Sequence, residues 1–454
     1  MKKHLRCGSI YHFRKQLPFF LLLISCFVMA ESQNGLTLQQ ALQQAQSHSP
    51  VLQRQQAILQ ESAAKVVESE SAFLPSLSGN ISYLLGKNYM LVDTQLGGSS
   101  ITIPQILPTT MDSLNLQWNL FEGFAGVHRR QAALAMESSS KSELQWTHFK
   151  LERNIQLLFY KCLSSRILLE TANQNLKTLQ DHLKDVMATR QAGIATRYDV
   201  LRVEVQVSDA ESEVTKAENL FENSQYQLAE AMGIEKLSQI PTGVLPPITT
   251  DLKLPFEKSS EASSVQRTDI LSLQQKVQSL HFESEAFHSH WLPKLSFVGQ
   301  YNFYNNRNDR FLDQDAFRDS YQMGLQLSWN FFDGFASSAK ENAAFQRRLQ
   351  SEATLRQTEL HATQEIQTWQ RQWKYFSKVY RTKINDIAKS EEAVRLAQEG
   401  RRAGTRTNTE LLDAESELFR SRASVIHAQM GALESLIQLE LATGQNLFSL
   451  TSKE

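Results

Sequence analysis

Two stretches of the chain alternate apolar and polar residues and then change into long helical patterns. These stretches are residues 113–121 and residues 321–331. The first leads into Trp118-Asn-Leu-Phe-Glu-Gly-Phe-Ala125 and the second into Trp329-Asn-Phe-Phe-Asp-Gly-Phe-Ala336, a shift of 211 residues. Strict alternation is typical of a β-strand with one apolar and one polar face. The shared ending predicts strand–helix junctions at Gly123 and Gly334.

Further matches extend this repeat in both directions. They are Gly193 with Gly404 and Thr196 with Thr407 at a shift of 211, and Leu74-Pro-Ser-Leu77 with Leu292-Pro-Lys-Leu295 at a shift of 218. A chain that repeats itself over nearly half its length is expected to be one supersecondary unit built twice. The predicted parts are a signal peptide over residues 1–30, a first repeat over 31–240, a proline-rich linker over 233–260 and a second repeat over 261–454.

Each repeat is predicted to contain a helix, a β-hairpin, a long helix, a tight turn and a further helix. In the first repeat the hairpin is expected at about 76–121, the long helix at about 124–192 and the following helix at about 197–232. In the second repeat these elements are expected at about 294–332, 335–403 and 408–443. Residues 86–111, which include Gly97, Pro104 and Pro108, are predicted to form a long loop inside the first hairpin.

Along each predicted long helix, apolar residues recur every three or four positions. In the first helix the positions are Leu151, Ile155, Leu158, Cys162, Ser165, Leu169, Ala172, Leu176, Leu179, Leu183 and Val186. Their equivalents are Ala362, Ile366, Trp369, Trp373, Phe376, Tyr380, Lys383, Ile387, Ser390, Val394 and Ala397. A mean step of 3.5 residues predicts a left-handed coiled coil. At 1.5 Å per residue, such a helix is about 100 Å long.

A turn-and-cap sequence follows each long helix. Gly193 suits the left-handed position just beyond a helix end. Thr196 and Asp199 have the spacing of a capping box, in which each side chain satisfies a free backbone N–H at the start of the next helix. Thr407 and Glu410 repeat this spacing.

Composition narrows the classes of function. The 454 residues carry 47 basic and 48 acidic side chains, and a formal net charge of −1 argues against a nucleic-acid-binding surface. Only 18 Gly and 10 Pro residues are present, so few turns and long elements are expected. Beyond residue 30, no apolar run approaches the roughly 20 residues of a membrane-spanning helix.

The first 30 residues are typical of a secretory signal. Basic residues precede an apolar stretch at 17–28, and small residues favour cleavage after Ala30. As an alternative, the residues ending in Cys26 resemble the lipobox of bacterial lipoproteins, in which that cysteine is lipidated. Outside this segment only Cys162 remains, so no intrachain disulfide is expected.

The four predicted strands fit a membrane-spanning β-barrel with lipid outside and water inside, because each has one apolar and one Ser/Asn/Gln face. Four strands are too few to close a barrel, since the smallest that fill their own interior have about eight. An open edge in lipid would leave backbone groups unpaired at several kcal/mol each. Several chains must therefore share one barrel, and a dimer or a trimer would satisfy this. Helices about 100 Å long exceed a hydrocarbon core of about 30 Å and are expected to project from it.

The repeat and its motifs resemble the TolC family of outer-membrane export channels. The motifs are Leu-Pro-x-Leu before the first strand, Phe-[Glu/Asp]-Gly-Phe after the second, and Gly404-Thr-Arg-Thr407 followed by Glu410-Leu-Leu-Asp413. The resemblance covers about residues 36–445. It implies a mainly helical, TolC-like homotrimer with a 12-stranded outer-membrane barrel and a periplasmic coiled-coil tunnel. It also implies a Gram-negative outer-membrane location, a periplasmic adaptor (membrane fusion) protein and an inner-membrane pump of the RND or ABC type.

The resemblance further implies roles for residues at the helix turns. Acidic rings that constrict the tunnel would fall on Asp199, Glu410 and Asp413, with Arg406 as an ion-pair partner. The turns at Gly193, Thr196, Gly404 and Thr407 would be the tips that the adaptor contacts. Three copies of Glu410 and Asp413 around one axis should favour cations. Alternatively, Asp199 and Glu410 act only as helix caps, Asp413 is solvated surface, and the turns have no docking role.

One group of side chains could suggest a metal site. His281, Glu285 and His288 fall at i, i+4 and i+7 on one helical face, with His290 nearby. A structural zinc site normally needs four ligands in a closed geometry, so we interpret these residues as solvated helix surface. The two tryptophans of the second seam are expected to pack rather than to bind a cofactor. No nucleophile elbow, P-loop or Cys-x-x-Cys motif is present, so neither an enzyme nor a cofactor is predicted.

Three hypotheses follow. The first is a trimeric outer-membrane channel of a tripartite efflux or type I secretion system. It would be a passive export channel opened by a periplasmic adaptor and an inner-membrane pump, and the sequence does not specify its cargo. The second is a coiled-coil outer-membrane adhesin or spacer without channel activity, although such proteins usually place their membrane strands at one terminus. The third is a soluble metal-binding helical protein, which would purify without detergent.

Overall fold

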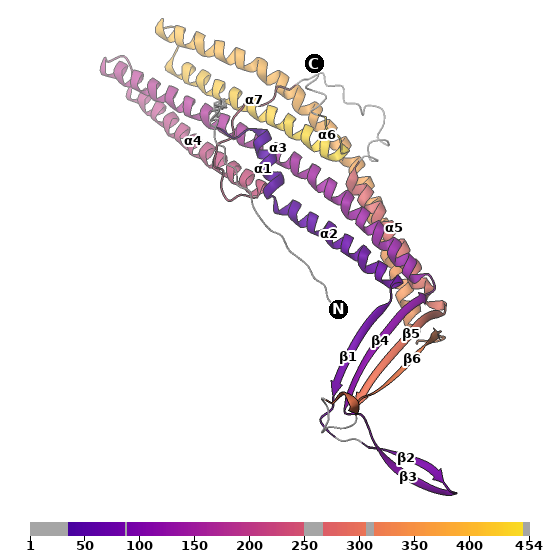
Figure 1. Ribbon diagram of the computed structural model, residues 1–454. Coiled ribbons are helices and arrows are strands. Elements are labelled where there is room, and N and C mark those ends of the chain that lie inside the picture. The colour runs from indigo at the N-terminus through magenta and orange to yellow at the C-terminus, as the bar shows by residue number, and fades with distance from the viewer. Residues whose placement is uncertain (1–34, 87–88, 249–266, 306–312, 448–454) are drawn as a thin grey trace, which may run out of the picture. The chain divides into compact units, whose positions relative to one another are not determined.

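The computed structural model describes residues 35–86, 89–248, 267–305 and 313–447. The expected signal peptide, including Cys26, lies outside these residues, as do residues 249–260 of the expected linker. The described chain is mainly helical, with strands at one end of the long helices (Figure 1).

From α2 in the first repeat and α5 in the second, the two repeats contain equivalent elements in the same order, with η5 inserted between the two strands of the second repeat. The first has α1 (Leu38–His48), α2 (Pro50–Glu70), η1 (Ser71–Phe73), β1 (Ser76–Tyr83), β4 (Thr110–Phe121), α3 (Ala125–Gln191) and α4 (Arg197–Met232). The second has α5 (Thr268–His288), η3 (Ser289–Trp291), β5 (Lys294–Asn305), η5 (Gln314–Ala316), β6 (Arg318–Ser328), α6 (Ala336–Arg402) and α7 (Asn408–Thr443). Equivalent helices have equal lengths: 21 residues in α2 and α5, 67 in α3 and α6, and 36 in α4 and α7. This agreement confirms the predicted tandem repeat.

The prediction of a structureless loop at 86–111 is wrong. Two additional strands, β2 (Tyr89–Leu96) and β3 (Ser99–Ile106), form a separate antiparallel hairpin there. Gly97 and Gly98 have φ of 60° and 87°, the left-handed values that a two-residue hairpin turn requires. Pro104 is tolerated because each strand of a two-stranded ribbon has one side without a hydrogen-bonding neighbour.

The other four strands form one antiparallel sheet in the order β1-β4-β5-β6. Its register places Leu116 opposite Leu77 on one side and opposite Gly299 on the other, so the apolar positions of all strands share one face. β4 and β5 pair across the boundary between the repeats, and β1 and β6 are the edges of the sheet. One chain therefore contributes four strands and two open edges.

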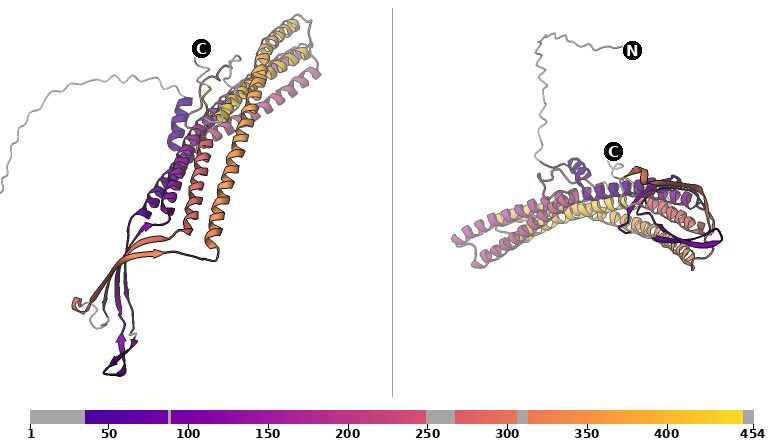
Figure 2. Two further views of the ribbon diagram at one scale, coloured as in Figure 1. Left: turned by 90° about the vertical axis from the view of Figure 1, so that its right-hand side faces the viewer. Right: turned by 60° about the horizontal axis from the view of Figure 1, so that its bottom comes forward.

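The long helices form two coiled hairpins, α3 with α4 and α6 with α7 (Figure 2). In the expected seams, every residue is buried or half-buried, which confirms the period of 3.5. Ser165, which interrupts the apolar pattern of the first seam, is buried with its hydroxyl 2.8 Å from that of Ser224 on α4. Helix α3 also packs along α7, so the two hairpins adhere to each other.

No helix within the described residues is both long enough and apolar enough to cross a membrane.

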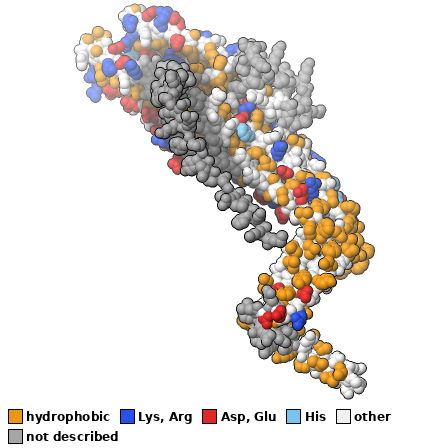
Figure 3. All heavy atoms as spheres, viewed as in Figure 1, with side chains coloured by type: hydrophobic (Ala, Val, Ile, Leu, Met, Phe, Trp, Pro, Cys, Tyr) orange, Lys and Arg blue, Asp and Glu red, His pale blue; other side chains and the backbone are white. Residues whose placement is uncertain are grey.

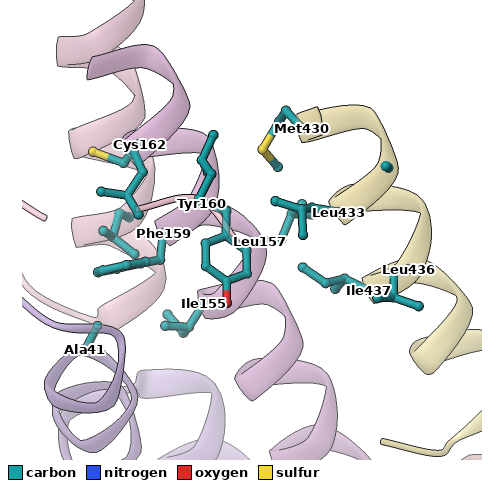
Figure 4. Packing of buried hydrophobic residues seen from close by; sticks show 14 of the residues in the cluster. Ala41, Ile155, Leu157, Phe159, Tyr160, Cys162, Met430, Leu433, Leu436 and Ile437 are labelled. Carbon is teal, nitrogen blue, oxygen red and sulfur yellow. The ribbon is translucent and has the colours of Figure 1, made fainter. Parts of the chain in front are cut away.

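The larger apolar cluster joins the middle of α3 to the C-terminal half of α7. Leu157 and Tyr160 of α3 lie toward the α7 side chains Leu433 and Ile437, whereas the Phe159 ring points away from α7 (Figure 4). Burial of such side chains contributes about 1.5–3 kcal/mol each relative to exposure. The contact between the two hairpins is therefore part of the core of the chain.

Gly431 of α7 lies directly under the ring of Phe376 of α6. A Cβ atom at Gly431 would be 2.6 Å from Phe376 Cε1, so any larger side chain requires the ring to move. In the first repeat the equivalent positions are Ser165 and Leu220, so the small and large residues are exchanged.

We expect Gly431→Leu to lower the free energy of unfolding by about 1–3 kcal/mol, because it overpacks this contact. The double substitution Gly431→Leu/Phe376→Ser, which reproduces the pair of the first repeat, should recover part of the loss. Thermal unfolding followed by circular dichroism in detergent would measure both. If the double variant were no more stable than Gly431→Leu, steric exchange would not explain the pair.

Candidate functional site

The four-stranded sheet has one face that is apolar and exposed within a single chain. Ile81, Tyr321 and Met323 are 86%, 74% and 73% exposed, which is unusual for large apolar side chains in water. In Figure 3, hydrophobic side chains gather over the strands and their junction with the helices. The opposite face carries amide and hydroxyl groups, such as Gln322, whose amide donates to Gln300 Oε1 at 2.7 Å. The sheet is therefore amphipathic, with one apolar and one polar face.

The strand–helix junctions at Gly123 and Gly334 lead the chain from sheet into helix through the same left-handed backbone conformation. Both glycines have positive φ, 64° and 69°, and each is followed by a phenylalanine that is also left-handed. Phe124 and Phe335 have φ of 68° and 67°, a conformation that costs a non-glycine residue roughly 1–2 kcal/mol. Gly123 is buried, whereas Gly334 is exposed.

At the other end of the long helices, the turns have the predicted local geometry. Gly193 and Gly404 have φ of 79° and 72°. Thr196 accepts from the Asp199 N–H at 3.2 Å, while its own N–H donates to the Asp199 carboxylate at 2.9 Å. The Thr196 hydroxyl, together with this N–H, holds the pKa of Asp199 below its usual value.

Thr407 and Glu410 form the second capping box. The Thr407 N–H donates to Glu410 Oε2 at 2.8 Å, and the Glu410 N–H donates to the Thr407 hydroxyl at 3.3 Å. The Thr407 N–H and hydroxyl lower the pKa of Glu410, with a smaller contribution from the nearby Arg406. Arg406 Nη1 lies 3.7 Å from Glu410 Oε1, so these two expected partners do form an exposed ion pair.

Asp413 has a different partner, which the sequence analysis missed. Its carboxylate is 71% exposed and lies 3.8 Å from Arg202 of α4. Arg202 also donates to the Thr409 hydroxyl at 3.0 Å, which links α4 to the start of α7. Within one chain, therefore, the carboxylates of Glu410 and Asp413 are exposed and each has an arginine nearby.

A buried polar cluster near the same tips was also missed. His182 of α3 is 5% exposed, and its Nδ1 lies 3.2 Å from Oε2 of Glu415, which is 7% exposed on α7. Its Nε2 contacts Asn408 Oδ1 and lies 3.3 Å from Arg401 of α6. Arg401 also lies 3.3 Å from the Asp185 carboxylate. This group, which we call the tip cluster, joins one coiled hairpin to the other. Its only signal in the sequence was a polar residue, His182, directly before the seam position Leu183.

The three histidines and one glutamate considered as a metal site do not converge on one point, and two of the histidines contact other charged side chains. His288 Nδ1 lies 2.7 Å from Glu341, which raises the pKa of His288 by hydrogen bonding to its charged form. His281 is within 3.2 Å of Arg348, a cation that would disfavour a bound metal. Across the part of the chain that the structure describes, no three His, Cys, Asp or Glu side chains converge as metal ligands.

Comparison with known proteins agrees with this architecture. The pyoverdine export outer membrane protein OpmQ of Pseudomonas putida is 22% identical over 326 residues, 69% of this chain and 66% of that protein. The matched stretch thus spans slightly less than two thirds of that relative. The CmeC outer membrane channel of Campylobacter jejuni superposes with a TM-score of 0.75 at 14% identity, covering 92% of this chain and 88% of CmeC. The outer membrane protein VceC of Vibrio cholerae gives a TM-score of 0.74 at 14% identity, covering 90% of this chain and 96% of VceC.

The superpositions on CmeC and VceC establish a shared fold. The family model described as outer membrane efflux protein matches residues 41–234 and 260–445, one segment in each repeat and most of the chain in total. The chain belongs to the outer membrane efflux protein family.

Proposed function

We propose that this chain is one of three identical subunits of an outer-membrane export channel in a Gram-negative bacterium. The observation that carries the proposal is the exposed apolar face of a four-stranded sheet with two open edges. Three copies would supply twelve strands, which can close into a barrel with its apolar face in lipid and its Gln- and Asn-rich face in water. Family membership and the fold support this arrangement.

The paired helices would continue the barrel as a water-filled tunnel in the periplasm. A periplasmic adaptor would contact the turns at Gly193–Thr196 and Gly404–Thr407, and an inner-membrane pump of the RND or ABC type would drive transport. The channel itself would be passive. OpmQ is named for pyoverdine export, but a wall of amide and hydroxyl groups provides little selectivity among cargoes, so we propose no single substrate.

Conductance in a planar bilayer tests this function directly. Protein purified in detergent should form discrete ion-conducting channels, because a twelve-stranded barrel encloses a lumen. A coiled-coil adhesin or spacer would give no conductance, and a soluble helical protein would remain monomeric and folded without detergent. Either result would reject the channel.

We expect the double substitution Glu410→Gln/Asp413→Asn to lower the preference for K⁺ over Cl⁻ several-fold, because three-fold repetition of these carboxylates concentrates six negative charges around one axis. Reversal potentials in asymmetric KCl would measure it. The matched control is Thr407→Ala, which removes the cap but keeps both charges and should leave selectivity unchanged. Equal selectivity in wild type and in the double variant would show that these residues serve only the helix ends.

A further inference from the structure

The two strand–helix junctions have the same backbone but different surroundings. A Cβ atom built at Gly123 would lie 2.8 Å from Leu292 Cβ and 2.9 Å from the Ser289 carbonyl oxygen, so this junction is tightly covered. The same atom at Gly334 meets nothing within 4 Å. Likewise Ala125 is 4% exposed, whereas the equivalent Ala336 is exposed. The second junction thus lacks the cover that the first one has.

The cover of the first junction is the η3 turn with Leu292, which belongs to the other repeat. Its equivalent in the first repeat is the η1 turn with Leu74, and Leu74 is 64% exposed. Each turn is anchored to its own repeat by the same hydrogen bond. Trp118 Nε1 donates to the Phe73 carbonyl at 2.9 Å, and Trp329 Nε1 donates to the Trp291 carbonyl at 3.1 Å. The η1 turn is therefore held like η3 but has no junction of its own chain to cover.

A hollow of about 340 Å³ lies at the uncovered junction. Its lining includes Trp291, Phe331, Phe332, Asp333 and Phe335. The three phenylalanines are 77%, 71% and 73% exposed in the order of the sequence. Exposed aromatic side chains around a concave surface are typical of a protein contact.

We infer that this hollow is the socket for the η1 turn of a second copy of the chain, with Leu74 of the neighbour over Gly334 as Leu292 lies over Gly123. The inference rests on the proposed oligomeric channel and specifies how its subunits meet. The occupant is a second copy because the first repeat already shows an equivalent turn on an equivalent junction.

The relation between the two repeats also predicts the register in which β6 of one copy pairs with β1 of the next copy. Within the chain, Leu116 of β4 lies opposite Gly299 of β5. Shifting β4 by 211 residues onto β6, and β5 by 218 residues onto β1, places Leu327 of one copy opposite Ile81 of the next. Both side chains belong to the apolar face, so the apolar band continues across the subunit boundary.

Disulfide cross-linking in membranes, in a Cys162→Ser background, tests both contacts. Directly opposite residues have Cβ atoms about 4.5–5.5 Å apart, so Ile81→Cys/Leu327→Cys should form an interchain disulfide after slight relaxation. Leu74→Cys/Gly334→Cys should do the same at the socket. On non-reducing gels we expect dimer and trimer bands, with the linked peptides identified by mass spectrometry.

Two controls isolate the predicted geometry. Gly123→Cys/Leu292→Cys has the equivalent spacing within one chain and should give an intrachain disulfide without oligomer bands. Ile81→Cys/Leu325→Cys is displaced by two residues, about 7–8 Å, and should cross-link weakly. If the channels conduct but the displaced pair links best, or neither predicted pair links, the socket and register are wrong while the channel stands. If no conductance or oligomer is found, the proposed function itself fails.

Discussion

Replacing Glu440 with alanine is expected to lower the free energy of unfolding by about 3–5 kcal/mol, the largest stability effect that we predict for this chain. Glu440 of α7 is fully buried, and its carboxylate lies 2.6 Å from Arg153 Nε of α3. It also accepts from the Leu447 N–H. Removing the carboxylate would leave the guanidinium of Arg153, which is 8% exposed and stacks 4.6 Å from the Phe149 ring, without its buried counter-charge.

The chain contains a matched control for this substitution. Lys161 and Glu434 also join α3 to α7, at 3.0 Å, but their side chains are 39% and 37% exposed. Glu434→Ala should therefore cost at most about 1 kcal/mol. Chemical unfolding in detergent, followed by circular dichroism, would compare the two variants. Equal losses for Glu434→Ala and Glu440→Ala would show that burial does not determine the strength of the α3–α7 contact.

A second comparison separates charge from packing at the same place. In the double substitution Arg153→Met/Glu440→Leu no buried charge remains, and apolar residues of similar volume replace the pair. Such replacements are often neutral or stabilising. We therefore expect this variant to be more stable than Glu440→Ala, because the single substitution leaves one buried charge whereas the double one leaves none.

Periodicity and capping motifs predicted most of the helical structure. The step of 3.5 residues placed the seam correctly because only one face of each long helix is covered by its partner. Thr196 and Thr407 located helix starts because a hydroxyl and an acidic side chain three residues later satisfy each other's backbone N–H groups. These interactions are local in sequence, which is why a pattern reveals them.

Interactions between residues that are far apart in the sequence could not be predicted from local patterns. Arg153 pairs with Glu440 across 287 positions of the chain, and neither residue has a local signature. The β2–β3 hairpin did have a signal, since Gly97-Gly98 is a two-residue turn between strand-like segments. Pro104 in β3 and Pro108 just beyond it concealed the hairpin, because proline argues against a central strand but not against a strand at an edge.

Substituting His182 with alanine is expected to loosen the tips of the two coiled hairpins. In the proposed channel the tip cluster ties α3 to the end of α6 and the start of α7, and Leu179 and Val186 pack with Leu412 beside it. Loss of the imidazole would leave Glu415 buried without this partner, a cost of about 1–3 kcal/mol to the closed arrangement. A free-energy cost of this size raises the population of the conformation in which the tips are apart by about 5–150-fold. Single-channel recording should show a higher open probability.

A control substitution for His182→Ala is available on the same helix. Lys184 and Asp181 form an ion pair at 2.9 Å, but the two side chains are 76% and 60% exposed, so Lys184→Ala should leave the open probability unchanged. Glu415→Gln keeps a hydrogen-bonding group beside His182 and should fall between wild type and His182→Ala. An open probability of His182→Ala equal to that of Lys184→Ala would mean that the tip cluster stabilises the fold without restraining the tips. A graded increase from Glu415→Gln to His182→Ala would instead identify hydrogen bonding between the two hairpins as the restraint, since the apolar contacts beside the cluster are the same in both variants.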